Sequence, residues 1–153
     1  MKIFSYKYLF ILSLLLFISC FNPDKKDINN LLDKRQKSFE LKDENLYSDL
    51  IFENYNSLED DKTVNKSNVI EQFKLNVSPF DSISFIKSKR DIYLENGSAK
   101  VLIEASIDLK IENEKSTYKT KELLNLIKIN NKEWRISKES KLDLFRGFVF
   151  GDK

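Results

Sequence analysis

Histidine is absent from this chain, and cysteine occurs only once, as Cys20. The absence of histidine removes the commonest general base and the commonest metal ligand of proteins. A single cysteine forms no disulfide within the chain and no cysteine-based zinc cluster. We therefore expect neither a metal site nor a cofactor.

An excess of charge of one sign is also missing. Lysine and arginine number 26 against 24 aspartates and glutamates, and two of the lysines, Lys2 and Lys7, lie in the leader described below. Proteins that bind nucleic acids normally carry a basic excess or stripe, so we expect no nucleic-acid partner. With 153 residues, 41% of them hydrophobic, the chain suits one folded domain after its leader.

The chain has one long hydrophobic run, YLFILSLLLFI at residues 8–18. Lys2 and Lys7 precede it, and the small Ser19 follows it. The run is shorter than the ~20 apolar residues of a membrane-spanning helix. A positive start, an apolar centre and a small residue at the end predict a secretory signal peptide over residues 1–19.

The four residues FISC at 17–20 resemble a bacterial lipobox. The resemblance implies that Cys20 becomes the lipidated first residue of a lipoprotein of the cell envelope, anchored at the outer membrane. Phe17 stands where leucine is usual, as in the relaxed lipoboxes of spirochaetes, and the residues leave surface or periplasmic exposure open. The alternative is an ordinary signal peptide with a chance cysteine.

The mature part begins with a short tether at residues 20–26 and continues as a domain at 27–153. A helix is predicted from Asp27, its expected N-cap, because residues recur at spacings of three and four. Those residues are Ile28, Leu31, Leu32, Arg35 and Phe39. A second helix is predicted over 44–55, then a polar loop over 57–67 and a third helix from Ser67 to Pro79.

After Pro79 the hydrophobic period becomes two, which predicts strands. Asn96-Gly97 predicts a two-residue type I′ hairpin turn, which would pair Leu94 with Ala99, Ile92 with Val101 and Ile86 with Ile107. A three-residue turn at 113–115, a strand over 117–129, a turn at 130–132 and a strand over 133–140 follow. The fold class is α+β, with three N-terminal helices packed on a curved four-stranded antiparallel sheet.

This order of elements, with a Lys42-Asp43 step between the first two helices, resembles NTF2-like domains, which include ketosteroid isomerase and SnoaL. The resemblance covers about residues 27–141, and a cystatin-like wrap is the alternative. It implies a cone of sheet and helices whose mouth holds a ligand. The residues expected to reach into such a cone are Arg90, Asn125, Tyr47 and Tyr55. An arginine there would hold an anionic ligand, whereas at the rim it would point to water.

Catalysis in such a cone would need an inward carboxylate and a hydrogen-bond donor. We expect the strand carboxylates to face outward, and the resemblance carries over no catalytic residue. These carboxylates belong to Asp91, Glu104, Asp108 and Glu122. The sequence therefore favours a non-enzymatic binding or scaffolding module over a carrier of a small apolar or anionic ligand, and over an isomerase- or hydrolase-type enzyme.

The outward face of the sheet is expected to be partly apolar, through Phe85, Leu102, Leu124 and Leu126. Such a patch suits a second copy of the chain, or an envelope or host protein. The alternative is that the aromatic tail at residues 142–150 folds back and covers it.

Overall fold

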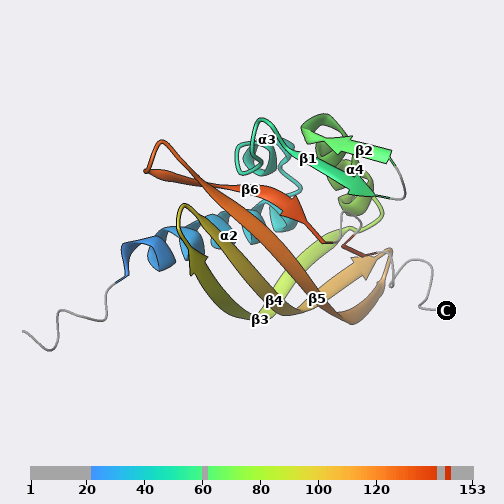
Figure 1. Cartoon of the computed structure of the whole chain (residues 1–153). Coiled ribbons are helices and arrows are strands. Elements are labelled where there is room, and N and C mark those ends of the chain that lie inside the picture. Colours follow the sequence, from blue (N-terminus) through green and yellow to red (C-terminus); the bar gives the residue numbers. More distant parts are fainter. Residues whose placement is uncertain (1–21, 60–61, 141–143, 146–153) are drawn as a thin grey trace, which may run out of the picture.

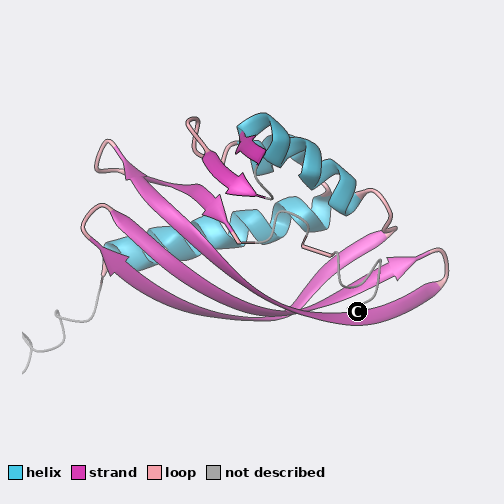
Figure 2. Cartoon of the chain, turned by 45° about the vertical axis from the view of Figure 1, so that its right-hand side comes forward, coloured by secondary structure: helices cyan, strands magenta, loops and turns pink. Residues whose placement is uncertain are grey.

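The computed structural model describes residues 22–59, 62–140 and 144–145. In this part of the chain three helices precede a four-stranded antiparallel sheet, which curves around the longest helix (Figures 1 and 2). The helices are α2 (Pro23–Leu41), α3 (Glu44–Ser48) and α4 (Lys66–Val77). The sheet has the order β3 (Ser82–Glu95), β4 (Ser98–Ile111), β5 (Glu114–Ile129) and β6 (Glu133–Glu139), and β1 (Asn56–Glu59) pairs separately with β2 (Lys62–Asn65). The predicted α+β architecture is confirmed.

Helix α2 begins earlier than its apolar spacing predicts. Asn22, not Asp27, is the N-cap, because its side chain accepts hydrogen bonds from the backbone N–H groups of Asp24 and Lys25. Pro23 then occupies the first helical turn, where its missing N–H costs nothing. The segment between Cys20 and the first helix is therefore shorter than the predicted tether.

The second predicted helix is only five residues long, because the chain after it pairs with the sheet. Ile51 forms a parallel bridge with Ile136 of β6. The Phe52 N–H donates to the Ile136 carbonyl at 2.8 Å, and the Ile136 N–H donates to the Leu50 carbonyl at 2.8 Å. The region predicted as a polar loop contains the β1–β2 hairpin, whose last residue, Asn65, caps α4.

The β3–β4 hairpin has the predicted register near its turn. Leu94 lies opposite Ala99 and Ile92 opposite Val101. Gly97 has a φ of +75° whereas Asn96 has a negative φ, so the turn is not the predicted type I′. A bulge between Phe85 and Lys87 then shifts the register and places Phe85, not Ile86, opposite Ile107.

The β4–β5 turn has two residues, Glu112 and Asn113, where three were predicted. Because successive side chains alternate between faces, one residue of difference turns the whole of β5 over. Leu124 and Leu126 lie opposite Val101 and Ala99 on the inner face and are 0% and 1% exposed. They are core residues, and the prediction that they form a partner face is wrong.

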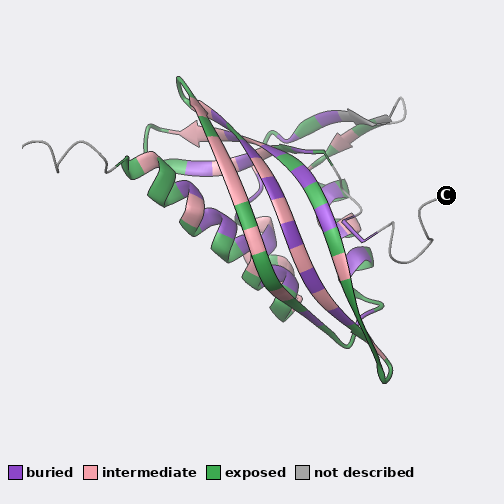
Figure 3. Ribbon diagram, turned by 90° about the horizontal axis from the view of Figure 1, so that it is seen from below, coloured by how far each residue is buried: buried purple, intermediate pink, exposed green. Residues whose placement is uncertain are grey.

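The outer face of the sheet therefore lacks Leu124 and Leu126. Figure 3 shows this face, where exposed and half-buried residues alternate with buried ones along the strands. Of the predicted apolar patch only Leu102 lies there, half-buried, while Phe85 packs against the core. The aromatic tail was predicted to cover this face, but its two described residues, Leu144 and Phe145, are buried on the inner side of the sheet. The Phe145 ring contacts Phe80 there. The other residues of 142–150 lie outside the described ranges.

Candidate functional site

A cluster of charged and phenolic side chains lies inside the domain, between α2 and the sheet. Its members come from α2, α3, the segment before β1, β5 and β6, and we call it the Arg35 network. They are Arg35, Tyr47, Tyr55, Glu122 and Glu139. All are buried, and the three charged residues are 2%, 3% and 1% exposed, in the order Arg35, Glu122, Glu139.

The guanidinium of Arg35 joins the two carboxylates. Its Nη1 and Nη2 donate to the two oxygens of Glu122 at 2.8 and 2.9 Å, and its Nε donates to Glu139 Oε1 at 3.0 Å. This planar fork geometry is what arginine offers to carboxylates and lysine does not. Arg35 therefore ties α2 to both β5 and β6.

The two tyrosines complete the bonding around Glu139. The Tyr47 hydroxyl donates to Glu139 Oε2 at 2.6 Å, and the Glu139 backbone N–H donates to the Tyr55 hydroxyl at 3.1 Å. Each of the four carboxylate oxygens of the network thus accepts at least one hydrogen bond. The groups satisfy one another, as buried charges must if they are not to destabilise the fold.

Burial changes the protonation of the network. It raises the pKa of Glu139 above the ordinary value of 4.5, because desolvation of the carboxylate outweighs the attraction of Arg35, and the charge of Glu122 adds to the effect. Burial also raises the pKa of Tyr47, which stays a donor. Burial alone would lower the pKa of Arg35, but Glu122 and Glu139 more than offset it, so Arg35 stays charged.

We expect Glu139→Gln to change how stability depends on pH. Because the folded-state pKa of Glu139 is raised, its contribution to stability is fully present below about pH 4.5 and is lost as pH rises through the folded pKa. Glutamine has no such titration, so the variant should gain stability relative to the natural chain as pH rises. Urea unfolding of both proteins at several pH values from 4.5 to 8 measures this difference.

The control is Glu104→Gln on the outer face. Lys121 lowers the pKa of Glu104, so its contribution to stability is lost as pH falls and the difference between variant and natural chain has the opposite trend. A Glu139→Gln variant that loses stability relative to the natural chain as pH rises would show that Arg35 dominates over burial.

Glu122 and Glu139 face inward for two different local reasons. The inward orientation of Glu122 follows from the two-residue turn before β5. The prediction that Glu122 faces outward is wrong. In β6 the register shifts by one residue between Asn125 and Leu126. This β-bulge turns Glu139 to the same side as Trp134 and Ile136, although simple alternation would place it outside.

Two of the four predicted ligand contacts reach the interior, and two do not. Tyr47 and Tyr55 are 3% exposed and belong to the Arg35 network. Arg90 instead lies at the β3 edge, where its Nη1 contacts Asp33 Oδ1 of α2 at 2.7 Å. Asn125 lies on the outer face beside Lys100.

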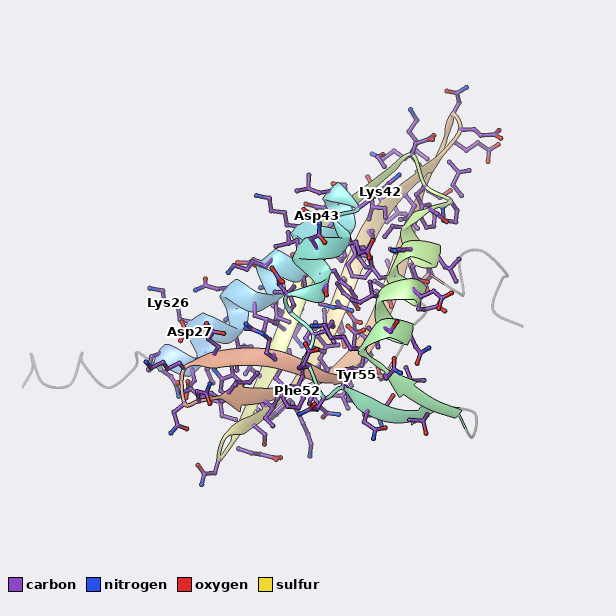
Figure 4. The ribbon with its side chains drawn as sticks, turned by 90° about the horizontal axis from the view of Figure 1, so that it is seen from above. Lys26, Asp27, Lys42, Asp43, Phe52 and Tyr55 are labelled. Atoms are coloured by element: carbon purple, nitrogen blue, oxygen red, sulfur yellow. The ribbon has the colours of Figure 1, made fainter. Side chains whose placement is uncertain are left out.

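A groove lies outside the network, between α2, the α3 segment and β6. Its volume is about 580 Å³. Figure 4 places Asp27 of α2 near one end of β6, and Phe52 and Tyr55 further along that strand. The charged lining residues, three of each sign, are Asp27, Lys34, Asp49, Lys132, Glu133 and Arg135. Three leucines, Trp134 and Asn30 complete the lining, so the groove suits a polar partner with a small apolar part.

Sequence reasoning missed the network because its signal was a single residue. Arg35 stands among apolar residues at helical spacing, and an arginine on a buried helix face requires an acidic partner. The sequence alone does not identify which acid that partner is. Across the described ranges, no three acidic, cysteine or histidine side chains gather in the way that a metal ion requires.

The fold is similar to that of several solved structures. A candidate scytalone dehydratase from Novosphingobium aromaticivorans matches with a TM-score of 0.64 at 10% identity, over 76% of this chain and 80% of that one. A candidate dehydratase of the NTF2-like family from Streptomyces avermitilis has a TM-score of 0.64 at 10% identity, over 76% and 95%.

An NTF2-like superfamily protein from Salmonella enterica serovar Typhimurium has a TM-score of 0.63 at 14% identity, over 75% of this chain and 87% of that one. No protein-family model matches the sequence, and no curated protein matches it. At these identities the similarity shows the NTF2-like fold alone.

Proposed function

We propose that this protein is a lipoprotein of the bacterial cell envelope, anchored through Cys20, whose NTF2-like domain is a non-enzymatic binding module. The groove between α2 and β6 is its binding surface. The observation that carries the binding role is that the polar groups of the Arg35 network already have hydrogen-bond partners within the network. The buried ionisable groups of this network, which a catalytic site inside this fold would need to be free, bond to one another instead.

The leader sequence supports the anchor. The cysteine follows an apolar run and the small Ser19, where lipoprotein signal peptidase would require it. Each buried methylene of an acyl chain contributes about 0.8 kcal/mol, so two or more chains hold a protein stably on a bilayer. None of the helices in the described ranges could itself cross a membrane.

The dehydratases among the similar structures raise the alternative of an enzyme. In this chain the one described interior acid with a raised pKa, Glu139, has both oxygens occupied by Arg35 and Tyr47. The groove is not lined by any residue of the Arg35 network. A general acid must contact its substrate, so the geometry favours binding over dehydration.

Intact-mass spectrometry of the native protein and of Cys20→Ala tests the anchor. We expect the native protein to have the mass of the chain from Cys20 plus acyl groups, and to sediment with membranes. The Cys20→Ala variant should lose the acyl groups, because no other cysteine can carry the thioether.

A free thiol at Cys20, or a chain cut at another position without added mass, would contradict the proposal. The intact mass of the protein extracted from the membrane fraction distinguishes an acyl anchor from trapping of an uncleaved leader, since the latter keeps the mass of residues 1–19.

A further inference from the structure

The first turn of α2 lies very close in sequence to the proposed anchor. Asn22 is the N-cap and Pro23 the first helical residue. Three residue steps therefore join Cys20 to the helix, and these span at most about 11 Å. Once Cys20 carries lipid, the start of α2 must lie near the bilayer surface.

The same turn is held to the sheet by a polar contact. Asp24 Oδ1 accepts hydrogen bonds from Lys128 Nζ of β5 at 2.6 Å and from Trp134 Nε1 of β6 at 3.3 Å. The hydrogen bond from Lys128 also lowers the pKa of Asp24, so the carboxylate stays charged. The start of α2 therefore cannot move away from the sheet without breaking these contacts.

Two sheet turns lie at this end of the domain. The Lys128 backbone N–H donates to the Gly97 carbonyl at 3.0 Å, which places the β3–β4 turn beside Lys128. The β5–β6 turn follows directly, at Asn130 and Asn131. The β4–β5 turn, at Glu112 and Asn113, lies at the other end of β4, about 40 Å away along the strand (Figure 1).

We infer that the end formed by residues 22–26, 95–98 and 130–132 rests on the phospholipid bilayer that holds the Cys20 acyl chains, with the β4–β5 turn directed away from it. This inference rests on the proposed anchoring. The chemistry of the end suits a headgroup layer that carries both charges, because it exposes Lys25, Lys132, the carboxylate of Glu95 and the amides of Asn130 and Asn131. A short tether fastened to a rigid domain keeps this end the one nearest to the bilayer.

The test uses the full lipidated protein with one added cysteine, since the native cysteine is consumed by the thioether. Asn96→Cys and Asn113→Cys are a matched pair, because both residues are exposed asparagines in two-residue turns at opposite ends of β4. Each is labelled with a fluorophore sensitive to polarity and bound to vesicles of phosphatidylethanolamine and phosphatidylglycerol, with and without nitroxide lipids. Lys132→Cys gives a second probe at the expected contact end.

We expect nitroxide lipids to quench the probes at positions 96 and 132 several-fold more than the probe at position 113. A flexible insertion of ten glycine and serine residues after Phe21 should remove this difference. Equal quenching at 96 and 113 in the natural chain, or stronger quenching at 113, would overturn the inference.

Failure of the proposed anchoring gives a different result. In that case the same samples show no acyl mass and do not float with the vesicles, and both proposals fall. Lipidated protein that floats but shows equal quenching at both ends overturns only the orientation.

Discussion

Replacing Arg35 with methionine is expected to destabilise the domain by about 3–5 kcal/mol, because two buried carboxylates would lose their only described cation. The side chain of Arg35 is 3% exposed, so water cannot replace the lost bonds. A loss of this size is a large part of a small domain's total free energy of unfolding. Urea unfolding followed by circular dichroism measures the loss.

Arg135→Met is the matched control, since it makes the same replacement at a half-buried arginine. Arg135 pairs with Glu133 at 2.7 Å, and the two side chains are 30% and 64% exposed. An exposed pair of this kind contributes about 0–1 kcal/mol. Equal losses for Arg35→Met and Arg135→Met would show that the Arg35 network does not hold α2 to the sheet.

A triple variant keeps this test informative if Arg35→Met does not fold. Replacing Arg35, Glu122 and Glu139 together with methionine removes the charges as a set. Because apolar groups of similar volume often substitute for a buried ion pair without loss, the triple variant should recover most of the stability that the single one loses. A triple variant less stable than Arg35→Met would contradict this account.

Leu124→Ala is expected to cost about 2–5 kcal/mol, and Leu123→Ala less than about 1 kcal/mol. The two leucines are neighbours on β5, but Leu124 is 0% exposed and Leu123 is 38% exposed. The pair therefore measures directly which face of β5 packs on the core. Midpoints of thermal and urea unfolding of the two variants supply the comparison.

A larger loss for Leu123→Ala would mean that β5 pairs with β4 through the three-residue turn after all. Leu126→Ala provides an independent check, because Leu126 lies two residues along on the same inner face and is 1% exposed. It should behave like Leu124→Ala.

Local patterns were sufficient for some of the fold. The apolar stripe from Ile28 to Phe39 predicts the long helix, and the Asn96-Gly97 turn predicts the β3–β4 register as far as Lys87, because both depend on neighbours in sequence. The start of α2 was predicted too late. The prediction placed it where the apolar spacing begins, at Asp27, whereas the helix begins at its N-cap, Asn22. The leader and the lipid attachment at Cys20 also rest on adjacent residues alone, and both stay predictions.

The candidate site could not be derived in the same way. Glu122 faces inward because of one residue in the Glu112–Asn113 turn, and Glu139 faces inward because β6 bulges opposite Asn125. Neither event has a strong local signal, and each reverses a side chain completely. Glu122 and Glu139, the two acids that bond to Arg35, are 87 and 104 positions away from it in the sequence.

By itself, then, the sequence determined the class of fold and the long helix with an arginine on its buried face, while the attachment at Cys20 stays a prediction. Only the tertiary structure decided which acids meet that arginine, and that they satisfy one another. The physical reason is that a buried charge needs partners brought by distant strands, and these arrive through turns and bulges of single residues.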